Sequence, residues 1–221
     1  EAIFGEKKDE KLKKIFFETQ KDSLLGGAMA MREGIDAVNP DLSASFCCVG
    51  PSTEFAADIA KILAGKNGKP MVRVNNGNYT PAGAKRFNEH IHRAAKQIAV
   101  RKANGVEIPL AETDTCPQNR YSTSAQNLHA HFTGTILEGA DGAKHWITRL
   151  ATYEPSSGKA YRKKLGENAG FYEELARISP HINWLGCRIP LPKEANYGLI
   201  KENICAGSDG WYGIVLERLG F

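Results

Sequence analysis

Glu112 is the residue whose setting most strongly suggests chemistry. It follows the apolar run 108–111, at the predicted end of a strand. A carboxylate there needs nearby cations or hydrogen-bond donors to stay ionised, and Arg73, Arg120 and Arg149 lie near the ends of predicted strands. A carboxylate so placed can act as a nucleophile or as an acid/base group. An alternative interpretation is that Glu112 only orders the loop through a salt bridge.

Amide, carboxylate, guanidinium and aromatic side chains gather at the ends of the predicted strands. Active residues of parallel α/β folds lie at the carboxyl ends of the strands. This mixture suits sugar hydroxyls, which need paired polar partners and a flat apolar platform. We therefore predict a carbohydrate substrate, with Glu112 as the catalytic residue. The predicted substrate-binding residues are Arg73, Asn75, Asn76, Asp114, Arg120, Trp146 and Arg149. For Trp146, a place in the core is the alternative interpretation.

Other motifs point to chemistry less strongly. His129 and His131 are two apart on a predicted helix and so face different directions, whereas a metal pair prefers i and i+4. Packing or surface roles are therefore favoured for these histidines. The chemistry predicted for Glu112 requires no metal or organic cofactor. Cys116 lies two residues after Asp114 without an evident His partner, which leaves a different α/β enzyme using this thiol as a weaker alternative. No P-loop or GxGxxG motif follows a predicted strand.

Alternating strands and helices must position these side chains. After a long predicted helix at 6–38, the strands begin about 28, 35 and 37 residues apart, which is typical of right-handed βαβ crossovers. The pattern predicts an α/β fold with parallel strand–helix repeats in residues 1–178 and a connector toward a following domain in 179–221. The predicted strands are 42–50, 70–75, 106–112 and 143–150, and the later helices are 52–64, 81–103, 122–138 and 157–178.

Composition and charge exclude several classes of protein. The 221 residues carry a formal net charge of +4, and 42% are hydrophobic, which is typical of globular domains rather than disordered or collagen-like chains. Without a dense basic block, nucleic acid is not expected as a partner. Without an apolar run of roughly 18–20 residues, a membrane span is not expected either. The five cysteines form no CxxC pair, which favours reduced thiols and a cytoplasmic protein.

The segment 110–124, Leu-Ala-Glu-Thr-Asp-Thr-Cys-Pro-Gln-Asn-Arg-Tyr-Ser-Thr-Ser, resembles the region around the seventh strand of (β/α)8-barrel glycoside hydrolases of the β-galactosidase-like clan. The likeness continues in Gly-Ala-Asp-Gly-Ala-Lys-His-Trp at 139–146 on the next predicted strand. Residues 36–42 resemble the approach to the fifth strand, and 211–220 the exit toward an amidotransferase-like domain. The resemblance implies that the four strands are strands five to eight of a (β/α)8 TIM barrel.

The resemblance also assigns roles. It makes Glu112 the nucleophile of a retaining glycosidase, and it places the paired acid/base carboxylate on the fourth strand, upstream of residue 1. The chain is then expected to be a fragment that is inactive alone. Four parallel strands leave both sheet edges unpaired, so we expect a homo-oligomer or a longer polypeptide to cover them. The alternative is a non-catalytic carbohydrate-binding or assembly module on the same α/β scaffold.

Overall fold

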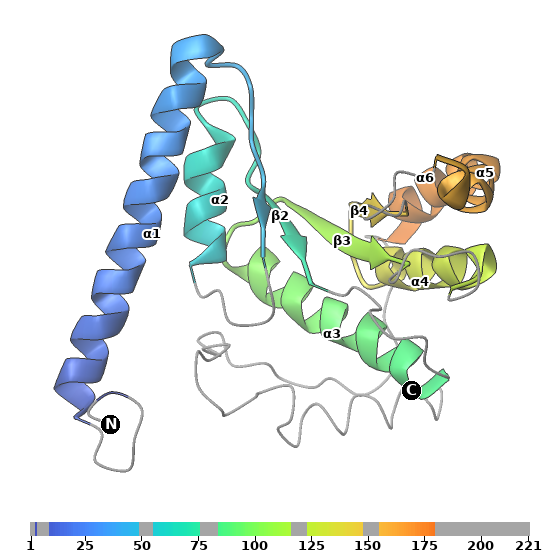
Figure 1. The fold of residues 1–221 in the computed structure, drawn as a ribbon, viewed down its shortest axis with the longest axis horizontal. Coiled ribbons are helices and arrows are strands. Elements are labelled where there is room, and N and C mark those ends of the chain that lie inside the picture. Colours follow the sequence, from blue (N-terminus) through green and yellow to red (C-terminus); the bar gives the residue numbers. More distant parts are fainter. Residues whose placement is uncertain are drawn as a thin grey trace.

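A computed structural model describes residue 3 and residues 9–48, 55–75, 84–115, 123–147 and 155–179. The predicted connector therefore lies almost entirely outside the described residues. Helices and strands alternate along the chain (Figure 1). In order they are α1 (Glu10–Val38), β1 (Phe46–Cys47), α2 (Ala56–Ala64), β2 (Met71–Val74), α3 (Ala84–Ala103), β3 (Ile108–Asp114), α4 (Ala125–Leu137), β4 (Gly142–Trp146), the 3-10 helix η1 (Pro155–Gly158), α5 (Lys159–Glu167) and α6 (Ala169–Ile178).

The four strands form one parallel sheet in the order β1-β2-β3-β4. Each strand lies beside its predecessor in the chain, and the connections run through α2, α3 and α4. The predicted α/β fold with parallel strand–helix repeats is thus confirmed, as a four-stranded open sheet within the described residues. Parallel strands need such crossovers because each must begin at the same edge of the sheet.

The main core lies between one face of the sheet and helices α2 and α3. Alternate strand residues point to this face, where they meet small and branched side chains of the two helices. Ala143 of β4 also contacts the cluster around Phe132 and Ile136 of α4, so α4 packs on the same face. The fully buried members include Cys48, Ala60, Val72, Val74, Ala94 and Ala111.

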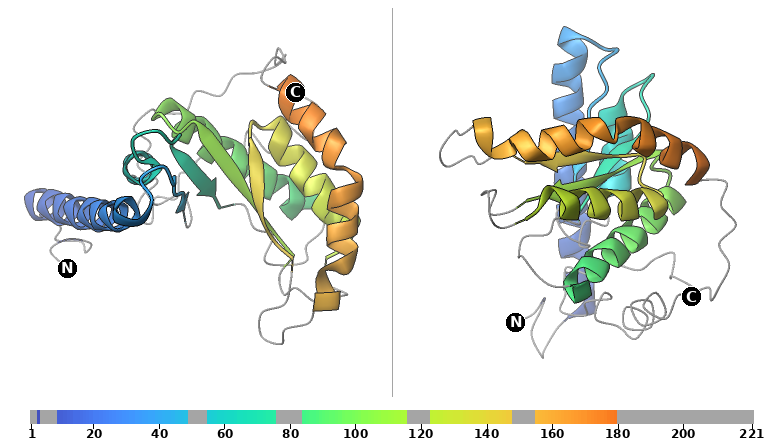
Figure 2. Two further views of the ribbon diagram at one scale, coloured as in Figure 1. Left: turned by 90° about the horizontal axis from the view of Figure 1, so that it is seen from above. Right: turned by 90° about the vertical axis from the view of Figure 1, so that its right-hand side faces the viewer.

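Helix α1 lies along α2 at one end of the sheet, whereas α5 and α6 lie along α4 at the other (Figure 2). The carboxylate of Asp9 caps α1 by accepting hydrogen bonds from the backbone amides of Lys11 and Leu12, an arrangement that offsets unpaired donors at a helix start. The buried Arg32 joins α1 to the body by donating to the carbonyls of Leu42 and Leu63, at 2.7 and 3.0 Å.

Several predicted boundaries differ from the structure, and the strand predicted over 143–150 ends at Trp146. Strand β1 has only two residues, and β3 extends through Asp114 because its ladder with β4 continues to the Asp114–Trp146 pair. The single helix predicted over 157–178 is interrupted at Asn168, whose side-chain amide donates to the carbonyl of Lys164 at 2.8 Å. That bond competes with helical continuation, and it lets α5 and α6 each contact α4.

Within the described part of the chain, no helix is both long enough and apolar enough to cross a membrane.

Candidate functional site

The side-chain alternation of the strands separates a core face from a polar face. Arg73 lies between the buried Val72 and Val74 of β2, so it projects to the side opposite the helices. The strand register places Glu112 beside Lys144, and Asp114 beside Trp146, on that same side. We call this side of the sheet the polar face. Its polar and aromatic members are Cys47, Arg73, Glu112, Asp114, Lys144 and Trp146, and the apolar Met71, Ile108 and Leu110 share the same side.

A largely buried ion pair joins Arg73 of β2 to Glu112 of β3. The guanidinium Nη1 lies 2.8 Å from a carboxylate oxygen, and the two side chains are only 12% and 7% exposed. The same nitrogen donates to the carbonyl of Cys48 at 3.4 Å. A buried charge needs a partner of this kind because desolvation of an isolated ion is expensive. The predicted cation beside Glu112 is therefore present, and the pair bridges two strands rather than a strand and a loop.

Asp114 and Trp146 occupy the last positions of β3 and β4 and lie opposite each other. Asp114 is buried, whereas Trp146 is 42% exposed. The carbonyl of Trp146 accepts hydrogen bonds from the amide and the hydroxyl of Thr115, at 3.2 and 3.3 Å. These bonds hold an exposed aromatic side chain at the carboxyl end of the sheet, close to the carboxylates. Exposed rings of this kind can stack on the apolar face of a sugar.

Gln97 fixes the end of β2, a role that the sequence analysis missed. Its side-chain oxygen accepts from the amide of Asn75 at 3.2 Å, and its nitrogen donates to the carbonyl of Asn75 at 2.6 Å. Gln97 is almost fully buried. In the sequence of α3 it lies between the core residues Ala94 and Ile98. A glutamine within the apolar stripe of a helix was the available signal, because a buried amide must find hydrogen-bond partners.

Lys144 and Cys47 also belong to the polar face, and the sequence analysis did not select them. The Lys144 ammonium lies 3.6 Å from the Cys47 sulfur, although the two residues are on the outermost strands. In a flat sheet, three strand spacings of about 4.8 Å would separate β1 from β4 by about 14 Å. A lysine side chain directed away from the sheet cannot span that distance. The sheet is therefore concave on its polar face.

Five of the predicted site residues lie within the described part of the chain. Arg73 and Glu112 are in contact, and Asp114 and Trp146 share their face of the sheet. Asn75 follows β2 and is held through its backbone. The predicted residues Asn76, Arg120 and Arg149, and the alternative nucleophile Cys116, lie outside the described residues.

Four of the described histidines, His90, His129, His131 and His145, contact side chains of neighbouring elements. His131 is buried between α4 and α3, with its ring near those of His90 and Phe87, and burial followed by the charge of His90 lowers its pKa to about 4. His129 receives or donates a hydrogen bond of 2.7 Å with the Tyr172 hydroxyl. Burial lowers the pKa of His145, which bonds to the Thr113 hydroxyl. No cluster of three or more potential metal ligands occurs among the residues that the structure describes.

Comparison with family models, curated proteins and solved structures gives no significant match. What the fold and site define is an α/β protein whose four-stranded parallel sheet carries charged and aromatic side chains on the face opposite its helices.

Proposed function

We propose that this chain is a catalytic segment of a retaining glycoside hydrolase, with Glu112 as its nucleophile. The observation that carries the proposal is the buried Arg73–Glu112 pair on the concave polar face. The neighbouring guanidinium fixes the position of the carboxylate, and a carboxylate held in place is what attack on a sugar carbon requires. Asp114 and Trp146, at the adjoining strand ends, supply a hydroxyl acceptor and a stacking surface for the substrate.

In this mechanism the Glu112 carboxylate attacks the anomeric carbon, and the leaving oxygen departs with a proton from a second carboxyl group. Water then hydrolyses the glycosyl ester and restores Glu112. A retaining pair requires carboxyl groups about 5–5.5 Å apart. Following the resemblance of 110–124 to glycosidases, we assign the second carboxyl to a segment other than the described residues.

The proposed architecture is part of a (β/α)8 barrel, in which β1 to β4 are strands five to eight. Three features support it: the consecutive strand order, the packing of α2, α3 and α4 on one face, and the concavity of the other face. Strands β1 and β4 are the edges of this sheet in the described structure. Exposed edges favour pairing, so a second copy or another part of a longer polypeptide is the proposed cover.

Covalent trapping tests the nucleophile directly. A panel of 2-deoxy-2-fluoroglycosyl fluorides is incubated with the protein that carries this chain, and labelled peptides are sequenced by mass spectrometry. Fluoride departs without protonation, so labelling does not depend on the acid/base group. We expect a glycosyl ester on Glu112. A stable label on another carboxylate would contradict the assignment, as would sugar binding with no labelling and no cleavage, which instead identifies a binding module.

Substitution of Glu112 tests the same assignment by enzyme kinetics. Glu112→Gln is expected to lower kcat by about four orders of magnitude or more, because a nucleophile is lost, while circular dichroism shows an intact fold. Azide should restore turnover to Glu112→Ala by replacing the missing carboxylate. The matched control is Glu107→Gln, an exposed carboxylate that precedes β3, which should retain normal turnover. Unchanged turnover in Glu112→Gln would end the assignment.

A further inference from the structure

A cavity of about 570 Å³ lies where α4 begins beside η1 and α5. This volume falls within the range of small-molecule sites, which is about 300–1,000 Å³. The cavity is separate from the Arg73–Glu112 pair, since none of its lining residues belongs to the sheet. The described residues that line it are Thr123, Ser124, Ala125, Ser156, Lys159, Ala160, Tyr161 and Lys163.

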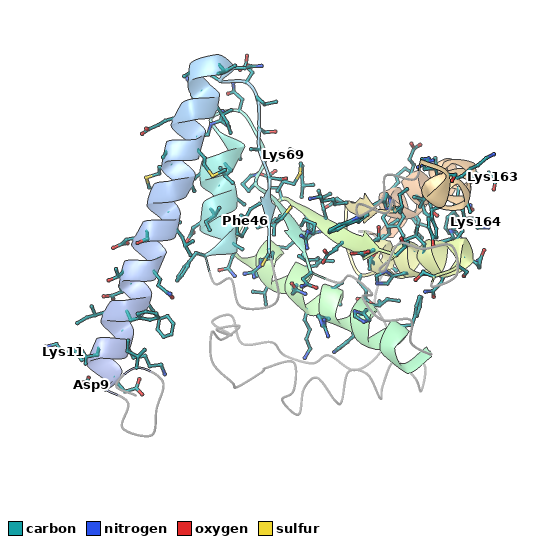
Figure 3. All side chains as sticks on the ribbon, viewed as in Figure 1. Asp9, Lys11, Phe46, Lys69, Lys163 and Lys164 are labelled. Atoms are coloured by element: carbon teal, nitrogen blue, oxygen red, sulfur yellow. The ribbon has the colours of Figure 1, made fainter. Side chains whose placement is uncertain are left out.

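The charged groups of this otherwise largely apolar lining are both cationic. Lys159 and Lys163 lie one turn apart on α5 (Figure 3 labels Lys163), and three of the other lining residues carry aliphatic hydroxyl groups. Among the described residues that line the cavity, none is acidic. The Lys163 ammonium is 3.8 Å from Glu167, but both side chains are mainly exposed. An exposed pair of this kind is weak, so Lys163 can turn toward an anion in the cavity.

Tyr161 connects the cavity to the candidate catalytic edge. Its hydroxyl donates to the carbonyl of Thr123 at 2.7 Å and lies close to the side chain of Thr115. Thr115 directly follows Asp114, the last residue of β3. Three residues of extended chain from Glu112 to Thr115 span about 10 Å. The cavity therefore lies within an oligosaccharide's length of the proposed nucleophile.

We propose that this cavity binds the anionic substituent of a saccharide: a sulfate, phosphate or carboxylate group held by Lys159, Lys163 and the neighbouring hydroxyls. Charge-assisted hydrogen bonds from ammonium groups are the strongest contacts that such a lining can offer to an oxyanion. The substrate of the hydrolase is accordingly an acidic saccharide. This substrate class rests on the proposed function, whereas anion binding by the cavity does not.

Binding is measured on the full chain by isothermal titration calorimetry with inorganic sulfate, inorganic phosphate and glucuronate, at ionic strength held constant with sodium chloride. Glucose serves as the uncharged comparison. We expect saturable binding of at least one anion and none of glucose, and the preferred anion identifies the substituent. No saturable binding of any of the three anions would overturn the proposal.

The double variant Lys159→Met/Lys163→Met is expected to weaken anion binding by about tenfold or more, which is the loss of about 1.4 kcal/mol or more. Lys14→Met/Lys66→Met removes the same net charge from exposed lysines outside the cavity, and it also breaks an exposed i,i+4 pair, Lys14–Glu18 at 3.8 Å. This control should bind normally. Equal weakening of anion binding in both double variants would show a general charge effect and would contradict the proposed site.

The Glu112→Gln variant separates the two proposals. It should bind the anion as the unmodified chain does, because Glu112 does not line the cavity. In cleavage assays with matched acidic and neutral aryl glycosides, Lys159→Met/Lys163→Met should raise KM for the acidic substrate alone. Anion binding without cleavage of any glycoside would keep the cavity and reject the hydrolase. Cleavage without anion discrimination would reject the acidic substrate and keep the hydrolase.

Discussion

At the scale of single residues, Arg73 stabilises the protein chiefly by compensating the buried charge of Glu112. Arg73→Met should lower the free energy of unfolding by about 3–5 kcal/mol, because removing one member of a buried ion pair strands the other. Urea denaturation at pH 7 measures the change. A second variant, Arg73→Met/Glu112→Gln, should recover part of the loss, since it leaves no unpaired charge.

Arg177 provides the matched control for Arg73. It forms a closer ion pair, 2.6 Å from Glu174, but both side chains are mostly exposed. Exposed pairs contribute little to stability, so Arg177→Met should leave the free energy of unfolding almost unchanged. Equal losses in Arg73→Met and Arg177→Met would show that burial of the Glu112 pair has no energetic consequence.

His131 makes the stability of the fold depend on pH. Its pKa of about 4 in the folded protein lies below the ordinary histidine value of 6.5, so the unfolded chain binds the proton more tightly. The contribution of His131 to the free energy of unfolding is fully present above pH 6.5 and is lost as the pH falls toward 4. The difference between the two pKa values corresponds to about 3 kcal/mol.

The measurement is urea denaturation at pH 4.5 and pH 7 for the unmodified chain and for His131→Leu, which keeps an apolar group between α3 and α4. The variant should lose much less stability between the two pH values. Burial also lowers the pKa of His145, so a smaller decline in the same direction should remain. An identical decline in both proteins would contradict the role of His131.

At the scale of secondary-structure elements, two glycines differ in the space around them: Gly68 lies in a crowded turn, and Gly27 lies on an open part of a helix. A Cβ atom at Gly68, between α2 and β2, would lie 2.1 Å from the carbonyl oxygen of Ala64 and 2.6 Å from Cβ of Ser43. At Gly27, within α1, no atom beyond the neighbouring residues and the local helix backbone lies within 4 Å of an added Cβ. The first position therefore determines how α2 leads into the sheet, whereas the second carries only the conformational cost of a helical glycine.

Two alanine substitutions should consequently act in opposite directions. Gly68→Ala should destabilise the protein by about 1–3 kcal/mol through overpacking against backbone. Gly27→Ala should stabilise it by up to about 1 kcal/mol through helix propensity. Thermal unfolding of the two variants measures both effects. A gain in stability for Gly68→Ala would mean that the turn can relax without cost.

At the scale of the whole molecule, the contact between Lys144 and Cys47 reports the curvature of the sheet. Succinimidyl iodoacetate, which leaves a two-carbon bridge between an amine and a thiol, should join these two residues within one chain. In a flat sheet their strands would be about 14 Å apart, beyond the reach of the reagent. Peptide mass spectrometry identifies the link.

Cys48 provides the internal control for this experiment, because it is buried on the core face immediately after Cys47. It should not be linked to Lys144. A cross-link found only between chains, or on Cys48, would contradict a sheet that is concave on its polar face.

Local patterns in the sequence determined the fold class and most of its elements. The alternation of apolar strands with helical stripes predicted four parallel strands, because hydrophobic periodicity and crossover length are properties of short segments. The position of Glu112 near the end of an apolar strand predicted its need for a cation, and Arg73 was among the three arginines selected. The end of β3 was less well predicted, since Asp114 joins the strand only through its ladder with β4.

Only the tertiary structure decided which side chains meet. Sequence could not show that Arg73 contacts Glu112, because that contact depends on strand register. It could not reveal that Gln97 holds Asn75, or that Lys144 reaches Cys47, since each contact joins segments more than twenty residues apart. Local propensity acts along the chain, whereas register and sheet curvature arise when distant segments pack. Composition and periodicity therefore predicted the scaffold, and packing of the sheet assembled its polar face.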